Sequence, residues 1–207
     1  ALVNADIAEA WLETLLSAES FGSFLPVNSA DTFDLEYWSL EQAKLGKKKL
    51  PSFTGNVIAV TGAGGVIGSE IARMFSAEGA EVIVMDKNIE SAEKTAKLCS
   101  PYALPIECDL TNPNEIKKTF ELILTHFGGL DILVSNAGAA WEGDISVLNE
   151  DILIKSININ LLSHQKVAQK AVEIFKAQDF LKKSSSSKLG GQLLFNISKQ
   201  SLNPGKG

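Results

Sequence analysis

The stretch NVIAVTGAGGVIGSEIARMF, residues 56–75, decides the fold of this chain. A run of β-branched and apolar residues ends in a glycine-rich turn, and that turn opens an amphipathic helix. Glycines remove side chains where the backbone must bend sharply and where a pyrophosphate comes close. The N–H groups at the helix start then face the anion. Although such turns also occur without a ligand, this one predicts a nucleotide-binding site at Gly62, Gly64, Gly65, Val66, Ile67 and Gly68.

A second apolar run, EVIVM at residues 81–85, ends at Asp86. Asp86 follows Gly68 by 18 residues, close to the roughly 20 expected for the acidic residue that holds an adenosine ribose. A carboxylate accepts hydrogen bonds from the ribose hydroxyls and repels a 2′-phosphate, so this position favours NAD over NADP as the cofactor. Two alternatives stay open: Asp86 simply caps the following helix, or Lys87 leaves room for a phosphate.

Strands and helices alternate from Gly55 onward. The predicted strands are 56–61, 81–86, 103–108, 130–135 and 191–197, and the predicted helices are 65–78, 88–98, 112–127 and 149–180. Each connection is long enough to hold a crossover helix, so the pattern predicts an α/β fold with a doubly wound parallel sheet. The polar run KKSSSSK, residues 182–188, predicts a flexible loop before the fifth strand.

Residues 1–50 do not belong to this alternating unit. Helical periodicity over 6–18 places Ile7, Ala10, Trp11 and Leu15 on one stripe, and a second helix is predicted at 35–45. Residues 21–33 are predicted to form a loop, and GKKK at 46–49 a solvated linker. We therefore divide the chain into a helical linker, 1–50, and a nucleotide-binding domain, 51–207.

Composition narrows the function classes. The 207 residues are 45% hydrophobic, which suffices for one domain with a core, and the net charge is −6. An acidic chain with a pI of about 5.0 argues against nucleic acid as a partner. The sequence has no apolar run near the ~20 residues that span a bilayer and no visible signal peptide. We therefore expect a cytoplasmic protein that acts on a small-molecule substrate without a membrane partner.

The cysteines and histidines do not form a metal-binding pattern. Cys99 near a helix end and Cys108 in a strand are expected to be buried, reduced thiols. His126 ends one predicted helix and His164 lies inside another, so both are expected to be structural. The sequence therefore predicts no metal site.

Three further pairs and turns complete a family pattern: Thr61-Gly62, Asp109-Leu110 and Asn136-Ala137-Gly138, the last within FGGLDILVSNAG at 127–138. From about Gly55 onward the chain resembles the short-chain dehydrogenase/reductase family. The resemblance implies a Rossmann-type three-layer αβα fold and an NAD(P)-dependent oxidoreductase. It also implies that Asp109 contacts adenine and that the Asn136 turn stabilises the central sheet beside the cofactor.

One departure from that family concerns the phosphate turn. The commonest family turn would place a glycine at Val66, whereas here the glycine is Gly65, as in the extended branch of the family. The Asn136-Ala137-Gly138 turn favours the more common branch. The path of the backbone at Gly65 and Val66 therefore stays open.

The resemblance also identifies part of a catalytic centre. Asn160 in ININ matches the family's asparagine, with Asn158 as a second candidate, and Ser198 matches its serine, with Ser201 or Lys199 as alternatives. The family's Y-x-x-x-K pair is expected about a dozen residues after the serine. Neither tyrosine of this sequence, Tyr37 or Tyr102, has a lysine four residues later. We therefore expect a domain truncated after the fifth strand and inactive alone. Its apolar edge at 191–197 should either be covered by a partner chain or belong to a longer protein whose further residues were disordered or cleaved away.

The N-terminal segment has a resemblance of its own. ESFG at 19–22 and FDLEYWSLEQAKL at 33–45 resemble the joining segment of bifunctional rhamnulose-1-phosphate aldolase/alcohol dehydrogenases. That resemblance implies a role in rhamnose catabolism and a small hydroxy-aldehyde substrate such as lactaldehyde. The resemblance to short-chain dehydrogenases implies a homo-oligomer. A non-catalytic nucleotide-binding or scaffolding module and an NADP-linked carbonyl reductase remain alternatives.

Overall fold

The structure, a computed structural model, describes residues 2–22, 25, 28, 31–32, 51–141, 144, 146–181 and 190–198. The chain divides into two units, Ala1–Leu50 and Pro51–Gly207. The elements in chain order are α1 (Leu2–Phe21), β1 (Val57–Thr61), α4 (Val66–Ala77), β2 (Glu81–Asp86), α5 (Ile89–Ala96), β3 (Leu104–Glu107), α6 (Pro113–Phe127), β4 (Ile132–Ser135), α7 (Glu150–Ile157), η1 (Asn158–Leu162), α8 (Ser163–Leu181) and β5 (Gln192–Phe195).

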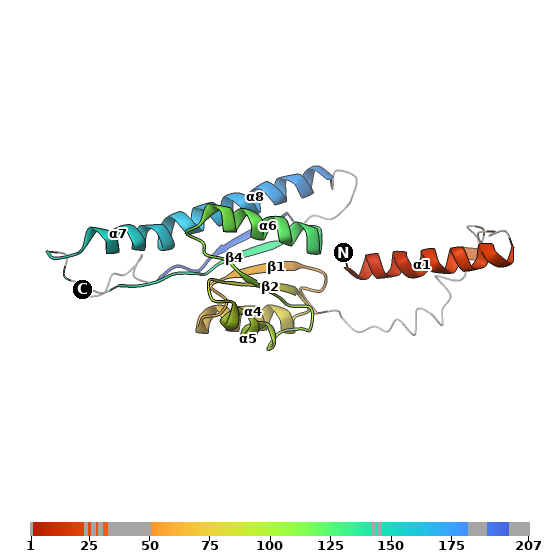
Figure 1. Ribbon diagram of the computed structural model, residues 1–207, viewed down its shortest axis with the longest axis horizontal. Coiled ribbons are helices and arrows are strands. Elements are labelled where there is room, and N and C mark those ends of the chain that lie inside the picture. The colour runs from red at the N-terminus through yellow and green to blue at the C-terminus, as the bar shows by residue number, and fades with distance from the viewer. Residues whose placement is uncertain are drawn as a thin grey trace. The chain divides into compact units, whose positions relative to one another are not determined.

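The larger unit is an α/β fold built on five parallel strands in the order β3-β2-β1-β4-β5 (Figure 1). Neighbouring strands pair in register: Ala59 of β1 lies between Ile83 of β2 and Leu133 of β4. Because β1 leads outward to β2 while the later strands lie on its other side, the sheet has a switch point between β1 and β4. Ligands of doubly wound sheets bind at the carboxyl edge of such a point.

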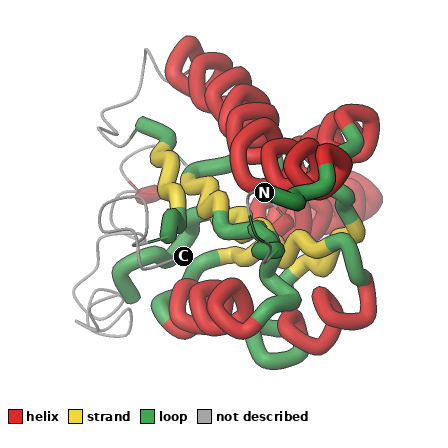
Figure 2. The backbone as a smooth tube through the Cα atoms, turned by 90° about the vertical axis from the view of Figure 1, so that its left-hand side faces the viewer, coloured by secondary structure: helices red, strands yellow, loops and turns green. Residues whose placement is uncertain are grey.

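Helices cover both faces of the sheet (Figure 2). Ile58 and Val60 point to one face and pack in a buried cluster with Ala72 of α4 and Ala92 of α5. Ala59 points to the other face, in a cluster that also contains buried residues of α6 and α8. Alternate strand residues thus fill two cores, which gives the predicted three-layer αβα architecture.

The predicted strands are confirmed to within two residues at each end. Cys108, predicted to end the third strand, lies one residue beyond it, because β3 ends at Glu107; its N–H still donates a 2.8 Å bond to the carbonyl of Asp86. Both cysteines are free thiols, but only Cys108 is fully buried, whereas Cys99 is partly exposed. The expectation of two buried thiols is therefore wrong for Cys99, which follows α5 at the rim of a core cluster.

The predicted helix 149–180 is not one regular α-helix. Its middle, η1, is a π-helical segment that separates α7 from α8. A π-turn inserts an extra residue into the helical repeat, and the hydrophobic periodicity on either side does not reveal it. Such turns are frequent at functional sites, and this one contains Asn160.

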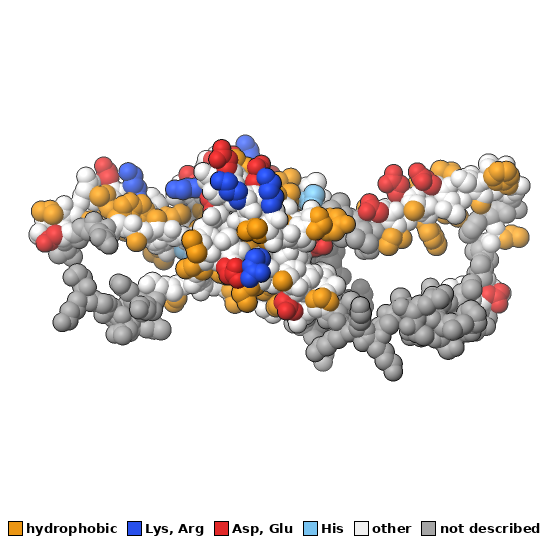
Figure 3. All heavy atoms as spheres, turned by 90° about the horizontal axis from the view of Figure 1, so that it is seen from below, with side chains coloured by type: hydrophobic (Ala, Val, Ile, Leu, Met, Phe, Trp, Pro, Cys, Tyr) orange, Lys and Arg blue, Asp and Glu red, His pale blue; other side chains and the backbone are white. Residues whose placement is uncertain are grey.

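The N-terminal unit contains α1, which begins before and ends after the predicted 6–18 and includes Phe21. The stripe residues Ile7 and Trp11 are 58% and 71% exposed, and acidic and hydrophobic side chains of this helix both reach its surface (Figure 3). Most of the predicted loop 21–33, the predicted helix 35–45, the linker 46–49 and the loop 182–188 lie outside the described residues. In the described part, no helix is long and apolar enough to cross a membrane.

Strand β5 is an edge of the described sheet. It pairs with β4 through Leu133↔Leu193 and Ser135↔Phe195. Phe195 is 48% and Ile197 66% exposed, so the strand presents the apolar surface that the sequence predicted there.

Candidate functional site

The glycine turn joins the carboxyl end of β1 to α4. Gly62 has a φ of +62°, a conformation that other residues rarely adopt, and a Cβ there would lie 2.8 Å from Cα of Ala137. A Cβ on Gly68 would collide with the Gly62 carbonyl oxygen and lie 2.7 Å from Nδ2 of Asn136. The first turn of α4 therefore packs directly on the Gly62 backbone, and Gly62 packs on the backbone of Ala137, just after β4.

The structure defines the turn where the sequence left it open. Gly65 is the N-cap of α4 and Val66 its first residue. The side chain of Val66 is 89% exposed and that of Ile67 62% exposed, so position 66 needs no glycine. The first N–H groups of an α-helix have no partner within the helix, and here they lie at the edge of a pocket that Gly65, Val66 and Gly68 line.

Asp86 ends β2 beside this turn. Its Oδ2 accepts a 2.9 Å bond from the Gly64 N–H and its Oδ1 a 3.0 Å bond from the Asn88 N–H. Asn88, not Asp86, caps α5, because the Asn88 side chain accepts from the Ser91 N–H. The alternative that Asp86 merely caps the helix is therefore wrong, and the carboxylate instead ties the end of β2 to the glycine turn.

Asp109 and Leu110 follow β3 at the same edge. Oδ1 of Asp109 accepts from both the N–H and the hydroxyl of Thr111, at 2.8 and 2.7 Å. Leu110 is only 5% exposed and belongs to the core below α6. Both residues line the pocket. The buried Leu110 anchors the loop in the core, whereas the carboxylate of Asp109 is exposed.

Asn136 connects three strands. Its N–H donates to Oγ1 of Thr61 at 2.9 Å, and its Nδ2 donates to the Thr61 carbonyl at 3.0 Å. Its Oδ1 accepts a 2.8 Å bond from Nδ2 of Asn196, which directly follows β5. Ala137 adds a bond from its N–H to Oγ1 of Thr61. The Asn136-Ala137-Gly138 turn is therefore locked to the end of β1 and to the end of β5.

These groups surround one pocket of about 440 Å³ at the carboxyl edge of the sheet. It is lined by every residue predicted to contact the cofactor except Gly64, whose N–H donates to Asp86. The residues fit a dinucleotide: the α4 N-terminus suits a pyrophosphate and Asp86 suits a ribose. Among the described residues, no group of three or more histidines, cysteines and acids could hold a metal ion.

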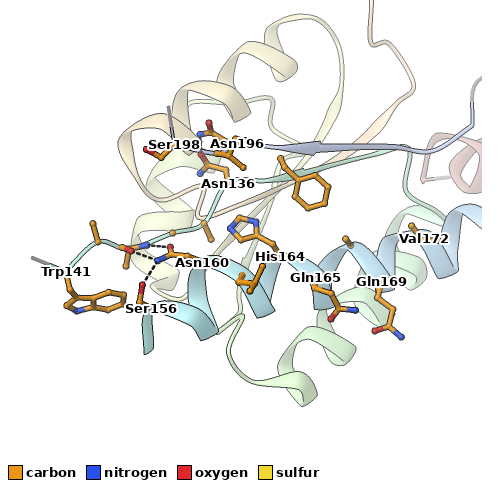
Figure 4. Close-up of a pocket in the computed structure, with 18 of the residues that line it drawn as sticks. Asn136, Trp141, Ser156, Asn160, His164, Gln165, Gln169, Val172, Asn196 and Ser198 are labelled. Carbon is orange, nitrogen blue, oxygen red and sulfur yellow. Dashed lines mark hydrogen bonds between the residues drawn. The ribbon is translucent and has the colours of Figure 1, made fainter. Parts of the chain in front are cut away.

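Asn160 lies in a second, larger pocket of about 1210 Å³ that shares the 136–139 turn with the first. Its Nδ2 donates to the Ala139 carbonyl at 2.8 Å, and its Oδ1 accepts from the Ala139 N–H at 3.0 Å. The side chain thus pairs with both polar groups of one backbone residue (Figure 4). Asn158, the second candidate, does not line either pocket.

Ser198 lies in the same large pocket as Asn160, on the segment that follows β5 (Figure 4). The alternatives Lys199 and Ser201 lie outside the described residues, as does Tyr37. Tyr102 is exposed before β3 and lines neither pocket. The structure therefore brings Asn160 and Ser198 to one cavity, and the described residues that line it include no tyrosine.

Two polar residues of the site were missed from the sequence. Asn196 holds Asn136, and no signal in the sequence indicated it, because this contact depends on the pairing of Ser135 with Phe195. His164 was expected to be only structural, but it lines the large pocket, and its Nδ1 shares a 2.6 Å hydrogen bond with Oγ of Ser135. Its position four residues after Asn160, one helical turn, was the available signal.

Comparisons with known proteins agree with this geometry. Across 204 residues the chain is 33% identical to an uncharacterized oxidoreductase, YuxG, of Bacillus subtilis, covering 94% of this chain and 28% of that protein. It is 31% identical to a probable NADP-dependent mannitol dehydrogenase of Yarrowia lipolytica, over 62% of this chain and 48% of that one. The chain thus spans less than half the length of these relatives.

Among solved structures, the fold resembles a 3-ketoacyl-(acyl-carrier-protein) reductase from Brucella melitensis complexed with NADH. The TM-score is 0.68 at 25% identity, covering 74% of this chain and 61% of that one. Residues 1–45 match the model for the second domain of class II aldolases. Residues 56–204, most of the chain, match the family model for short chain dehydrogenases, and the chain therefore belongs to the short-chain dehydrogenase family.

Proposed function

We propose that this chain is the cofactor-binding part of an NAD-dependent dehydrogenase that acts on a small alcohol or hydroxy-aldehyde. The observation that carries the choice of NAD is the carboxylate of Asp86 at the end of β2, held against the glycine turn by the Gly64 N–H. Each oxygen accepts one backbone bond and keeps a lone pair for a ribose hydroxyl. A 2′-phosphate would instead meet this negative charge.

In this proposal the other residues have separate tasks. The N-terminus of α4 neutralises the pyrophosphate, and Asp109 accepts a hydrogen bond from the adenine. NAD held in this pocket would supply the acceptor for the hydride that leaves the carbinol carbon of the substrate. The Ser198 hydroxyl holds the substrate oxygen, and Asn160 fixes the 139 backbone beside it. The proton released from the substrate hydroxyl needs a base. We expect the 207-residue chain alone to bind cofactor without turnover, because neither of its tyrosines has a lysine four residues later.

Exchange of Asp86 for alanine tests the cofactor assignment. The change removes the ribose partner and also the acceptor of the Gly64 N–H, so loss of turn geometry alone would weaken both cofactors equally. We expect the dissociation constant for NADH to rise about tenfold or more, the scale of a lost bond to a charged group, and that for NADPH to change little. Calorimetric titration of the same variant with both cofactors measures this ratio; an equal loss for both would contradict the assignment.

We also propose that the dehydrogenase is one half of a bifunctional protein whose other half is a class II aldolase. The match of residues 1–45 to an aldolase second domain supports this proposal, as does the similarity to YuxG across 94% of the chain, the N-terminal unit included. In such a protein, lactaldehyde released by aldol cleavage would be the substrate of the dehydrogenase. Oxidation of lactaldehyde with NAD by the full parental chain tests this substrate.

A non-catalytic nucleotide-binding module is the second candidate. The observation in its favour is the large pocket, which Asn160 and Ser198 line. Its described lining residues include no tyrosine, and the one lysine among them, Lys176, lies more than four helical turns after Asn160. Turnover of any small hydroxy-aldehyde by the full parental chain would exclude this candidate. NADH binding without turnover in that chain would support it.

A further inference from the structure

Two side chains on one face of the α7–η1–α8 helix hold the strand-turn segment 135–139. Asn160 pairs with the N–H and carbonyl of Ala139. One turn later, His164 shares its 2.6 Å bond with Oγ of Ser135, the last residue of β4. Figure 4 shows both side chains directed from the helix toward this segment. The Asn136-Ala137-Gly138 turn is thus fastened to the helix at each of its ends.

The surroundings of the imidazole favour its neutral form. Ser135 is 1% exposed, and the ring of Phe195 lies 6.3 Å away, centroid to centroid. Burial lowers the pKa of His164, and the nearby backbone carbonyl of Ala137 only partly opposes that shift. A proton on this ring would be a half-buried charge, which is costly without a counter-ion.

Among the described residues, no acidic side chain lies beside the ring to act as a counter-ion for such a charge. The residues that face it from β4 and β5, Ser135 and Phe195, are uncharged. Charged residues that line the same pocket, Glu173 and Lys176, belong to α8 itself, about 13 and 18 Å further along its axis at 1.5 Å per residue. Charged residues of α6, which also packs against α8, line a separate groove: Lys117 and Glu121.

We propose that His164 is a positioning residue for the cofactor, which in its neutral form holds the end of β4 and thereby the Asn136-Ala137-Gly138 turn that lines both pockets. This inference rests on the proposed NAD-binding function. The path is short: Ser135 precedes Asn136, whose side chain bonds the carbonyls of Thr61 and Gly62 in the glycine turn. A shift of the 135–136 backbone therefore changes the shape of the pyrophosphate cradle directly.

Protonation gives the proposal a measurable signature. A protonated ring donates at both nitrogens. A Ser135 hydroxyl that donates to the neutral ring must therefore turn to accept, and water must reach the charge. Because the pKa of His164 is lowered, we expect the change below the ordinary histidine pKa of about 6.5. From about pH 8 to that acidic range, NADH affinity should fall about fivefold, the scale of one net hydrogen bond. By linkage, bound NADH must lower the pKa of His164 further.

The experiment compares the pH dependence of NADH affinity in four proteins: wild type, His164→Asn, Ser135→Ala and, as the matched control, His126→Asn at the other histidine of the sequence. Asparagine keeps a polar atom near the Nδ1 position but does not titrate. We expect His164→Asn to bind NADH within about threefold of wild type at pH 8 and to lose most of the pH dependence. The control should retain it. Ser135→Ala should weaken binding at pH 8 by about fivefold.

Each outcome is decisive. An unchanged pH slope in His164→Asn, or unchanged affinity in Ser135→Ala, would overturn the inference. Should His164→Asn fail to fold, nitrogen NMR of the wild-type imidazoles gives the answer, because only two rings contribute signals. A His164 pKa that NADH leaves unaltered would reject the proposal, and one that falls on binding would support it. Complete absence of NADH binding in wild type would instead refute the proposed function itself.

Discussion

Replacement of Gly68 by alanine tests the closest contact of the site. The new Cβ would collide with the Gly62 carbonyl oxygen and lie 2.7 Å from Nδ2 of Asn136 and 2.8 Å from Cα of Ala63. Two of these atoms belong to backbone and the third to a side chain with bonds to two carbonyls. None is the free end of a flexible chain, so α4 itself must move.

The cost follows from that geometry. Forcing one extra carbon into a packed backbone contact costs about 1–3 kcal/mol, and we expect about 2 kcal/mol here because alanine's higher helix propensity offsets part of the strain. In a domain of this size that lowers the melting temperature by about 4–8 °C. The displaced helix start should also weaken NADH binding about tenfold or more, because the pyrophosphate loses its N–H donors.

Gly65 provides the matched control. A Cβ there meets only the Gly62 carbonyl oxygen, at 3.4 Å, an ordinary contact, and its φ of −81° suits any residue. Gly65→Ala should therefore change the free energy of unfolding by about 0.5 kcal/mol or less, as a weaker N-cap is offset by a less flexible unfolded chain. Urea titration followed by circular dichroism measures both variants. Equal stability of the two variants would refute the contact argument.

Two further predictions follow from the site and the core. Asp109→Ala should weaken NADH and other adenine nucleotides alike by about 1–2 kcal/mol, a lost bond to a charged group, and calorimetry that finds no change would count against contact with adenine. Burial raises the pKa of both cysteine thiols, so their difference in exposure sets the order of reaction. At about pH 8 iodoacetamide should modify partly exposed Cys99 first and buried Cys108 only on unfolding; peptide mass mapping of the native protein checks the order.

The elements of the nucleotide-binding unit were predictable from sequence because each carries a local signal. Buried parallel strands appear as apolar runs such as EVIVM, and Gly62 is required by a positive φ. The position of Asp86 beside the turn was predictable because it ends the second apolar run, 18 residues after Gly68. Its bond to Gly64 was not, because that bond joins residues 22 apart through the pairing of β1 with β2.

The π-helical turn and the role of His164 were not predictable in the same way. A π-turn changes the helix by one residue and leaves the apolar periodicity on both sides intact, so the pattern indicates a single helix. The neutral state of His164 depends on burial by β4 and β5, which no spacing along the helix expresses. In α1 the apolar periodicity correctly predicted a helix. It did not predict that Trp11, on the apolar stripe of that helix, is exposed.

The hydrogen bonds around Asn136 imply that the cofactor site and the edge strand form together. Asn196 donates its backbone N–H to the Ser135 carbonyl at 3.0 Å and its side chain to Asn136 at 2.8 Å. Asn136 in turn holds the carbonyls of Thr61 and Gly62. Docking of β5 therefore fixes Asn136, the residue that shapes the glycine turn at the end of β1, two strands away from β5 in the sheet. Since a ligand that binds only the ordered site stabilises every contact the site requires, NADH should protect the backbone of β5 from exchange, although that strand lies outside the small pocket.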